Sequence, residues 1–132
     1  MPRLVKGGKW TYGWVVVGPD GGVTIPPEAW QEFAFRDGEE AIFTPGSRRS
    51  GGFAISTVDL MRQVSRRLEG AAMGILARRR FQEGRVAVPA EAGARPGDRV
   101  LTVRGSRYGL AFVASGPIYE EALKHPGLEV FR

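Results

Sequence analysis

Apolar residues recur in short groups along this chain, and their spacing predicts mainly strands. Trp10, Tyr12 and Trp14 alternate with other residues, so a strand would carry all three rings on one face. Turn-forming residues at 18–22 and Pro26, which cannot donate to a ladder, bound the next apolar group. The apolar groups expected to form strands are 15–17, 23–25, 41–43, 53–55, 75–77, 100–103, 110–114 and 128–131.

Short helices are expected between the strands. Pro27 suits the first position of one helix and Pro117 that of another, over 118–124. Ser56 and Asp59 have the spacing of a capping box before a further helix. Gly93 limits another to about one turn, around 90–92. The apolar positions expected to face the core are Ala29, Trp30, Phe33 and Ala34 in the first helix and Leu60, Val64 and Leu68 in the capped helix.

One segment of the chain occurs twice. Residues 20–29 and 83–92 both read acid-Gly-x-Val-x-Ile/Val-Pro-x-Glu-Ala, at a spacing of 63 residues. The match continues at a spacing of 59, where 37–39 aligns with 96–98 and Gly46-Ser47-Arg48 with Gly105-Ser106-Arg107. Two ungapped blocks joined by a single deletion indicate an internal duplication.

The duplication divides the chain into parts. A first repeat is expected over 10–56, a helical linker over 57–72, a second repeat over 73–115 and a C-terminal tail over 116–132. Each repeat has about 45 residues, which is near the size at which a lone core stops being sufficient. We therefore expect the two repeats to pack on each other as one interlocked domain.

Charge is distributed unevenly between the repeats, although the whole chain has a net charge of +5. Residues 10–56 hold three basic and six acidic side chains, whereas residues 73–115 hold eight basic and three acidic ones. Arginine accounts for 16 of the basic residues and lysine for 3. The planar guanidinium suits bidentate contact with phosphate or guanine. A GC-rich genome would also favour arginine, but it would not concentrate the charge in one repeat.

The sequence lacks residues that several functional classes of protein require. The chain has no cysteine and one histidine, so it offers no disulfide, thiolate or Cys-His pair, and we expect neither an enzyme nor a cofactor. The segment 105–109 is rich in glycine but lacks the Lys-Ser/Thr of a phosphate-binding loop. No apolar run approaches the ~20 residues of a membrane span. We expect a cytoplasmic protein with no membrane contact.

The order of elements resembles the swapped-hairpin unit of the AbrB superfamily, which includes the AbrB and SpoVT regulators, the MazE antitoxins and MraZ. The segment 84–91, Gly-Arg-Val-Ala-Val-Pro-Ala-Glu, is close to the usual segment of that superfamily, and 95–99, Arg-Pro-Gly-Asp-Arg, is similar to its later Gly-Asp turn. The resemblance covers roughly 13–56 and 74–115, and tandem units in one chain are most similar to MraZ. It implies a mainly β fold with short helices, in which the two repeats form one swapped-hairpin β-barrel.

The resemblance also assigns candidate DNA-binding residues. In members that bind DNA, arginines on the first strand and at the Gly-Arg turn reach the duplex. That role falls to Arg78 and Arg85, with Arg79 and Arg80 adjacent, and Arg95 stands in for basic residues that the family has after its Pro-x-Glu segment. We call Arg78, Arg79, Arg80 and Arg85 the basic arm. The first repeat has Val15 and Gly22 at the matching positions, so the resemblance assigns it no arginine there for contact with DNA.

These observations predict a DNA-binding transcriptional regulator that grips the phosphates of double-stranded DNA through the basic arm. We expect a homo-oligomer, at least a dimer, because two-fold related half-sites require two arms. One alternative is the antitoxin of a toxin–antitoxin pair, with Tyr119, Leu123 and Phe131 of the tail contacting a toxin. Another is a module that mediates oligomerisation without DNA. The arginines would then form a solvated basic edge strand that discourages aggregation.

Overall fold

The chain folds into a mainly β structure with short helices. A computed structural model describes residues 10–46, 51–65, 74–106 and 109–132. Residues 1–9, Arg48 and Arg107 of the aligned Gly-Ser-Arg segments, and Leu68 of the expected capped helix lie outside these residues. In chain order the elements are β1 (Trp10–Val16), β2 (Gly22–Thr24), α1 (Pro27–Glu32), β3 (Glu40–Pro45), β4 (Phe53–Ser56), α2 (Val58–Ser65), β5 (Ala77–Arg80), β6 (Arg85–Ala87), the 3₁₀ helix η1 (Ala90–Ala92), β7 (Arg99–Ser106), β8 (Gly109–Val113), α3 (Pro117–Ala122) and β9 (Val130–Phe131).

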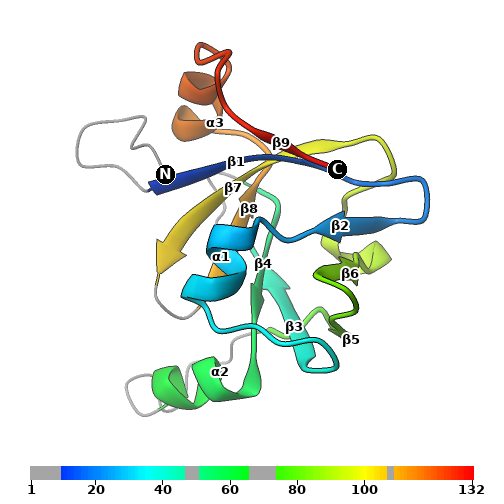
Figure 1. Ribbon diagram of the computed structural model, residues 1–132. Coiled ribbons are helices and arrows are strands. Elements are labelled where there is room, and N and C mark those ends of the chain that lie inside the picture. The colour runs from blue at the N-terminus through cyan, green and yellow to red at the C-terminus, as the bar shows by residue number, and fades with distance from the viewer. Residues whose placement is uncertain (1–9, 47–50, 66–73, 107–108) are drawn as a thin grey trace.

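Seven strands form one sheet in the order β5-β3-β4-β8-β7-β1-β9. In the alignment of the two repeats, β1, β3 and β4 correspond to β5, β7 and β8, so the order of the first six strands reads the same from both ends. Strands β5 and β9 have one neighbour each, and no closed barrel is found in the described part of the chain. Figure 1 shows α3 above β1 and β9 at one end of the molecule and α2 at the other end.

Most strand pairings join segments from the two predicted repeats. Strand β1 pairs with β7, and β3 pairs with β5, both antiparallel. The aligned residues Phe53 and Phe112 lie opposite each other in the β4–β8 pair. The aligned residues Val23 and Val86 do so in the separate two-stranded sheet of β2 and β6. Among the described residues, the strands that pair with the first two strands of each repeat therefore lie in the other half of the chain.

The main core lies on one face of the large sheet and is rich in aromatic residues. Phe43, Phe53 and Phe112 are fully buried, and the rings of Phe53 and Phe112 stack at 4.7 Å. Phe81 follows β5 and is also fully buried, with its ring against Trp30 of α1 and Phe35. A side chain from the second repeat thus completes the core beneath the helix of the first.

A smaller core lies on the opposite face of the sheet, under the tail. Trp14, Leu101 and Val103 of β1 and β7 pack there against Ala122 and Tyr119 of the tail. Trp14 is only 4% exposed, and its ring meets Tyr119 edge-on at 5.1 Å. The tail therefore converts an outer face of the sheet into a second core.

One local expectation was wrong. The rings of Trp10, Tyr12 and Trp14 were expected on one face, but Tyr12 enters the main core and Trp14 the smaller one. A β-bulge between Thr11 and Gly13 adds a residue to β1 and reverses the alternation. At the start of α2, the side chain of Thr57 accepts the hydrogen bond from the Leu60 main-chain N–H at 3.3 Å.

The tail depends on a close backbone approach at Gly13. The Trp14 N–H donates to the Glu129 carbonyl at 2.8 Å, and a Cβ added to Gly13 would lie 2.6 Å from that carbonyl oxygen. The φ of Gly13 is +149°, which L side chains rarely adopt. We expect Gly13→Ala to displace β9 and cost about 1–3 kcal/mol, with faster exchange of the Trp14 amide hydrogen.

The matching control for that variant is Gly127→Ala. It adds the same methyl group to the same tail, but nothing lies within 4 Å of the added Cβ. Equal exchange rates in the two variants would show that the close approach at Gly13 does not hold the tail.

Helix α1 is attached to the sheet by a partly buried polar cluster. The Tyr12 hydroxyl donates to the Glu32 carboxylate at 2.5 Å, and the Arg104 guanidinium donates to the other oxygen of the same carboxylate. Burial raises the pKa of Tyr12, and the hydrogen bond to Glu32 adds to the effect. Burial also acts to raise the pKa of Glu32, but the Tyr12 and Arg104 hydrogen bonds and the Arg104 charge outweigh it and hold that pKa below 4.5.

This cluster predicts a loss of stability in acid. Because the folded state lowers the pKa of Glu32, its contribution is present above pH 4.5 and is lost as pH falls through the folded-state pKa. Glu32→Gln should cost about 1–2 kcal/mol at pH 7 and flatten the decline of unfolding free energy below pH 4.5. Urea denaturation across pH measures both effects. Glu91→Gln, at an exposed position on η1, is the control, and an equal flattening there would contradict the assignment.

Candidate functional site

The candidate site is built around the three consecutive arginines of β5. This strand is an edge of the large sheet, and Arg78, Arg79 and Arg80 are all exposed on it. Their Cα partners on β3 are Ile42, Ala41 and Glu40. The sheet thus holds three cations at fixed positions on an open edge.

Each of these arginines already has a partner within the chain. The Arg78 guanidinium forms an ion pair with Glu40 at 2.7 Å. Arg79 donates to the main-chain carbonyl of Arg78 at 2.7 Å, and Arg80 donates to that of Gly38 at 2.8 Å. Among the described residues no carboxylate lies within ion-pair distance of Arg79 or Arg80. Their charge is therefore not neutralised by a direct partner.

Arg85 has a different environment from the other three arm residues. Its guanidinium donates to the Thr24 hydroxyl at 2.7 Å and forms an ion pair with Asp20 at 3.2 Å. The Thr24 hydroxyl in turn donates to the main-chain oxygen of Arg132. The Gly22 N–H is the main cause of the lowered pKa of Asp20, and the Arg85 charge acts in the same direction. Arg85 therefore joins β6 to the β1–β2 turn and, through Thr24, to the end of the tail.

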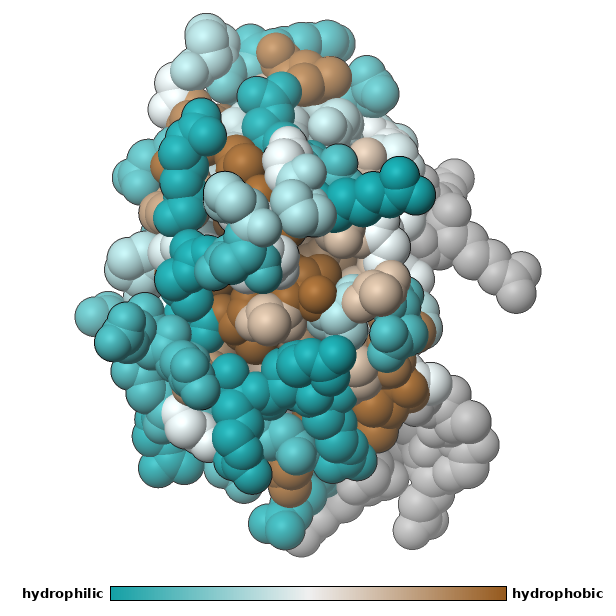
Figure 2. Space-filling model, turned by 90° about the vertical axis from the view of Figure 1, so that its right-hand side faces the viewer, coloured by the Kyte–Doolittle hydropathy of each residue, from teal (hydrophilic) through white to brown (hydrophobic). Residues whose placement is uncertain are grey.

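Beside β5 the surface is hollowed into an open cavity of about 830 Å³. Arg79, Arg80 and Arg85 border it, so the structure brings together three of the five predicted site residues. Three acidic residues border it as well: Asp20, Asp37 and Glu83. Figure 2 shows hydrophilic side chains around a hydrophobic patch on the side of the molecule that carries β2, β5 and β6. The formal charges of the lining cancel, and Arg79 and Arg80 are its exposed cations.

The other two predicted residues do not border this cavity. Arg78 is held in its ion pair with Glu40 and is not among the lining residues. Arg95 lies on the turn between η1 and β7, where its main-chain N–H donates to the Asp98 carboxylate. Its guanidinium is exposed.

Sequence reasoning missed the acidic residues of the site. Asp20 binds Arg85, Asp37 accepts the Gly84 N–H at 3.0 Å, and Glu40 binds Arg78. Asp20 and Asp37 are each followed by a glycine, and Asp-Gly pairs are typical of turns. Their second role, as acceptors for the other half of the chain, depends on strand pairing and has no local signal.

The tail does not present the three expected toxin-binding anchors as a free surface. Tyr119 packs on Trp14, and Phe131 packs against the main core. Leu123 is 49% exposed and is the anchor that projects from the body.

The described residues form neither a metal site nor a membrane-spanning helix. In the described part of the chain, no three His, Asp or Glu side chains are positioned to hold a metal ion. No described helix has the length and apolar character to cross a membrane. The comparisons add no relative, because no protein-family model, curated protein or solved structure matches this chain.

Proposed function

We propose that this chain is a cytoplasmic, DNA-binding transcriptional regulator of the AbrB-like swapped-hairpin type. The observation that carries the proposal is the pair Arg79 and Arg80. Both are exposed on an edge strand, and their guanidinium groups bond only to main-chain carbonyls among the described residues. A guanidinium has five N–H donors, so each retains donors for a phosphate oxygen.

The pattern of strand pairing supports the family assignment. The symmetrical strand order, the exchange of β1 and β5 between halves and the central β2–β6 pair fit two swapped hairpins in one chain. Phe81, from the second half, completes the core beneath α1. The fold would then be an interlocked pair of repeats, as the duplication and the small size of each half predict.

Within the basic arm we assign different roles to the four arginines. Arg79 and Arg80 contact phosphate, and Arg95 adds a further contact from its turn. Arg78 and Arg85 hold Glu40 and Asp20, which keeps the arm against β3 and β2. The three acidic residues of the lining favour a duplex that contacts Arg79 and Arg80 without entering the cavity.

The direct experiment is a mobility-shift titration of the full chain with random duplex DNA at two salt concentrations. We expect salt-sensitive binding, because phosphate contacts release counterions. Absence of any salt-sensitive affinity would favour the oligomerisation module, in which the arginines only protect an edge strand.

A homo-oligomer is part of the proposal, since one chain supplies one basic arm. Two arms about one helical turn apart would match two-fold related half-sites. Light scattering that shows a strict monomer at working concentration would contradict this. The antitoxin alternative is less well supported, because two of its three anchor residues pack on the body.

A further inference from the structure

Arg99 is a strand arginine without a carboxylate partner. Arg78, Arg85 and Arg104 each form an ion pair, with Glu40, Asp20 and Glu32 respectively. Arg99 forms none with any described residue. The residue of the first repeat that aligns with Arg99 is Glu40, which forms an ion pair with Arg78. At this position the first half therefore has a paired anion, and the second half has a cation that pairs with no described carboxylate.

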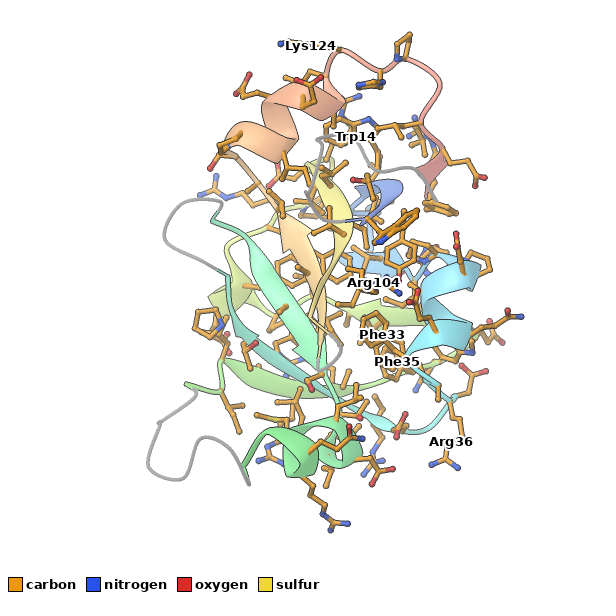
Figure 3. All side chains as sticks on the ribbon, turned by 90° about the vertical axis from the view of Figure 1, so that its left-hand side faces the viewer. Trp14, Phe33, Phe35, Arg36, Arg104 and Lys124 are labelled. Carbon is orange, nitrogen blue, oxygen red and sulfur yellow. The ribbon has the colours of Figure 1, made fainter. Side chains whose placement is uncertain are left out.

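The guanidinium of Arg99 is held in place by aromatic rings. Its central carbon lies 4.2 Å from the centroid of the Trp14 ring, and Tyr119 meets the same ring edge-on. Trp14 is buried between the sheet and the tail, close to α3 in Figure 3. Stacking on a buried ring fixes the plane of the guanidinium and leaves its N–H edges available.

A cleft of about 530 Å³ opens beside this stack. Arg99 and Tyr119 supply polar groups to its lining, and Phe53, Ala92, Val100 and Ala114 supply apolar ones. Asp98 also borders the cleft and adds one negative charge to its lining, and its carboxylate is held by the Arg95 main-chain N–H at 2.8 Å. Small-molecule sites typically measure about 300–1,000 Å³ and combine an apolar lining with a few placed polar groups.

We infer that this cleft binds a small organic anion, with its carboxylate or phosphate group on Arg99 and Tyr119 and its apolar part against the alanine-rich wall. The site is separate from the basic arm and does not depend on DNA binding. Because Tyr119 belongs to the tail, an occupant would also hold α3 against the sheet. The ligand class is a compact molecule with one oxyanion group.

The test is an NMR titration of the full chain with benzoate, phenyl phosphate and inorganic phosphate in turn. Saturable shifts of the Trp14 indole N–H and the Arg99 side-chain N–H are expected with the two aromatic anions. Arg99→Gln should weaken the affinity at least about tenfold, because a charge-assisted contact is lost. Arg99→Lys should give an intermediate affinity, because it keeps the positive charge and loses the planar guanidinium that can bind an oxyanion through two N–H groups. Tyr119→Phe should weaken the binding by a smaller factor.

Arg79→Gln/Arg80→Gln is the matched control and should leave these shifts unchanged. The inference is overturned if no probe gives saturable shifts, or if Arg99→Gln binds as tightly as wild type. It is also overturned if the shifts depend on Arg79 and Arg80. If Arg99→Gln instead weakens only DNA binding, Arg99 belongs to the nucleic-acid surface and the cleft is not a ligand site.

Discussion

Replacing Arg79 and Arg80 together with glutamine should lower the affinity for DNA about 60-fold at 0.1 M salt for each basic arm bound to the duplex. Each phosphate contact contributes about 0.9 to the slope of log K against log salt concentration, so losing two contacts reduces the slope by roughly 1.8. When the salt concentration falls from 1 M to 0.1 M, a slope smaller by about 1.8 makes the gain in affinity about 60-fold smaller. The loss should be similar for all sequences, because phosphate contacts carry no base information. Mobility-shift titrations over a salt series measure both quantities.

The fold should survive this change. Both guanidinium groups are exposed and bond only to main-chain carbonyls among the described residues, so each contributes little to stability. The control is Arg62→Gln/Lys124→Gln, which removes the same charge from α2 and the tail, where the side chains are 77% and 74% exposed. If the control loses as much affinity as the arm variant, net charge and not the arm controls binding.

Truncation of Phe81 should produce the largest loss of stability in the chain. Its ring is fully buried between Trp30 at 5.1 Å and Phe35 at 4.8 Å, and it comes from the half that does not contain α1. Phe81→Ala is expected to cost about 3–5 kcal/mol, from lost transfer energy and the cavity left behind. That is a large share of the roughly 5–15 kcal/mol that stabilises a typical domain. Urea unfolding followed by far-ultraviolet circular dichroism measures the cost.

Phe131→Ala is the appropriate comparison for this variant. Phe131 is partly exposed on β9, where it packs against the edge of the same core. We expect a clearly smaller loss there. An equal or larger loss would mean that the tail, and not the exchange of Phe81, holds the two halves together.

Local signals predicted most of the elements, although the strand expected over 75–77 lies at Ala77–Arg80. Pro27 and Pro117 begin α1 and α3, and Gly93 ends η1 with a φ of 79°. These residues restrict or free the backbone at their own position, so their effect can be read without knowing the fold. Local signals did not predict which face of the sheet each side chain of β1 occupies. One extra residue in the bulge between Thr11 and Gly13 places Trp14 on the face opposite to Tyr12.

The partners of the arginines could not be read from the sequence. Arg78 and Glu40 are 38 residues apart, and Arg85 and Asp20 are 65 apart. Each pair meets because β5 lies on β3 and β6 lies on β2. The acidic residues looked like turn formers, and nothing near them indicated a cation from the other half. Arg99 shows the reverse case, since no described carboxylate pairs with it and its stack on Trp14 follows from the pairing of β7 with β1.

The sequence by itself determined that the protein is mainly β, where its turns and short helices fall, and that its cations gather in one half. These properties follow from residue type and short-range spacing. Only the tertiary structure decided which arginines are neutralised, because ion pairing requires side chains from distant strands within about 4 Å. It left Arg79 and Arg80 bonded to carbonyls alone at the open edge of the sheet, and Arg99 stacked on a tryptophan that the tail buries.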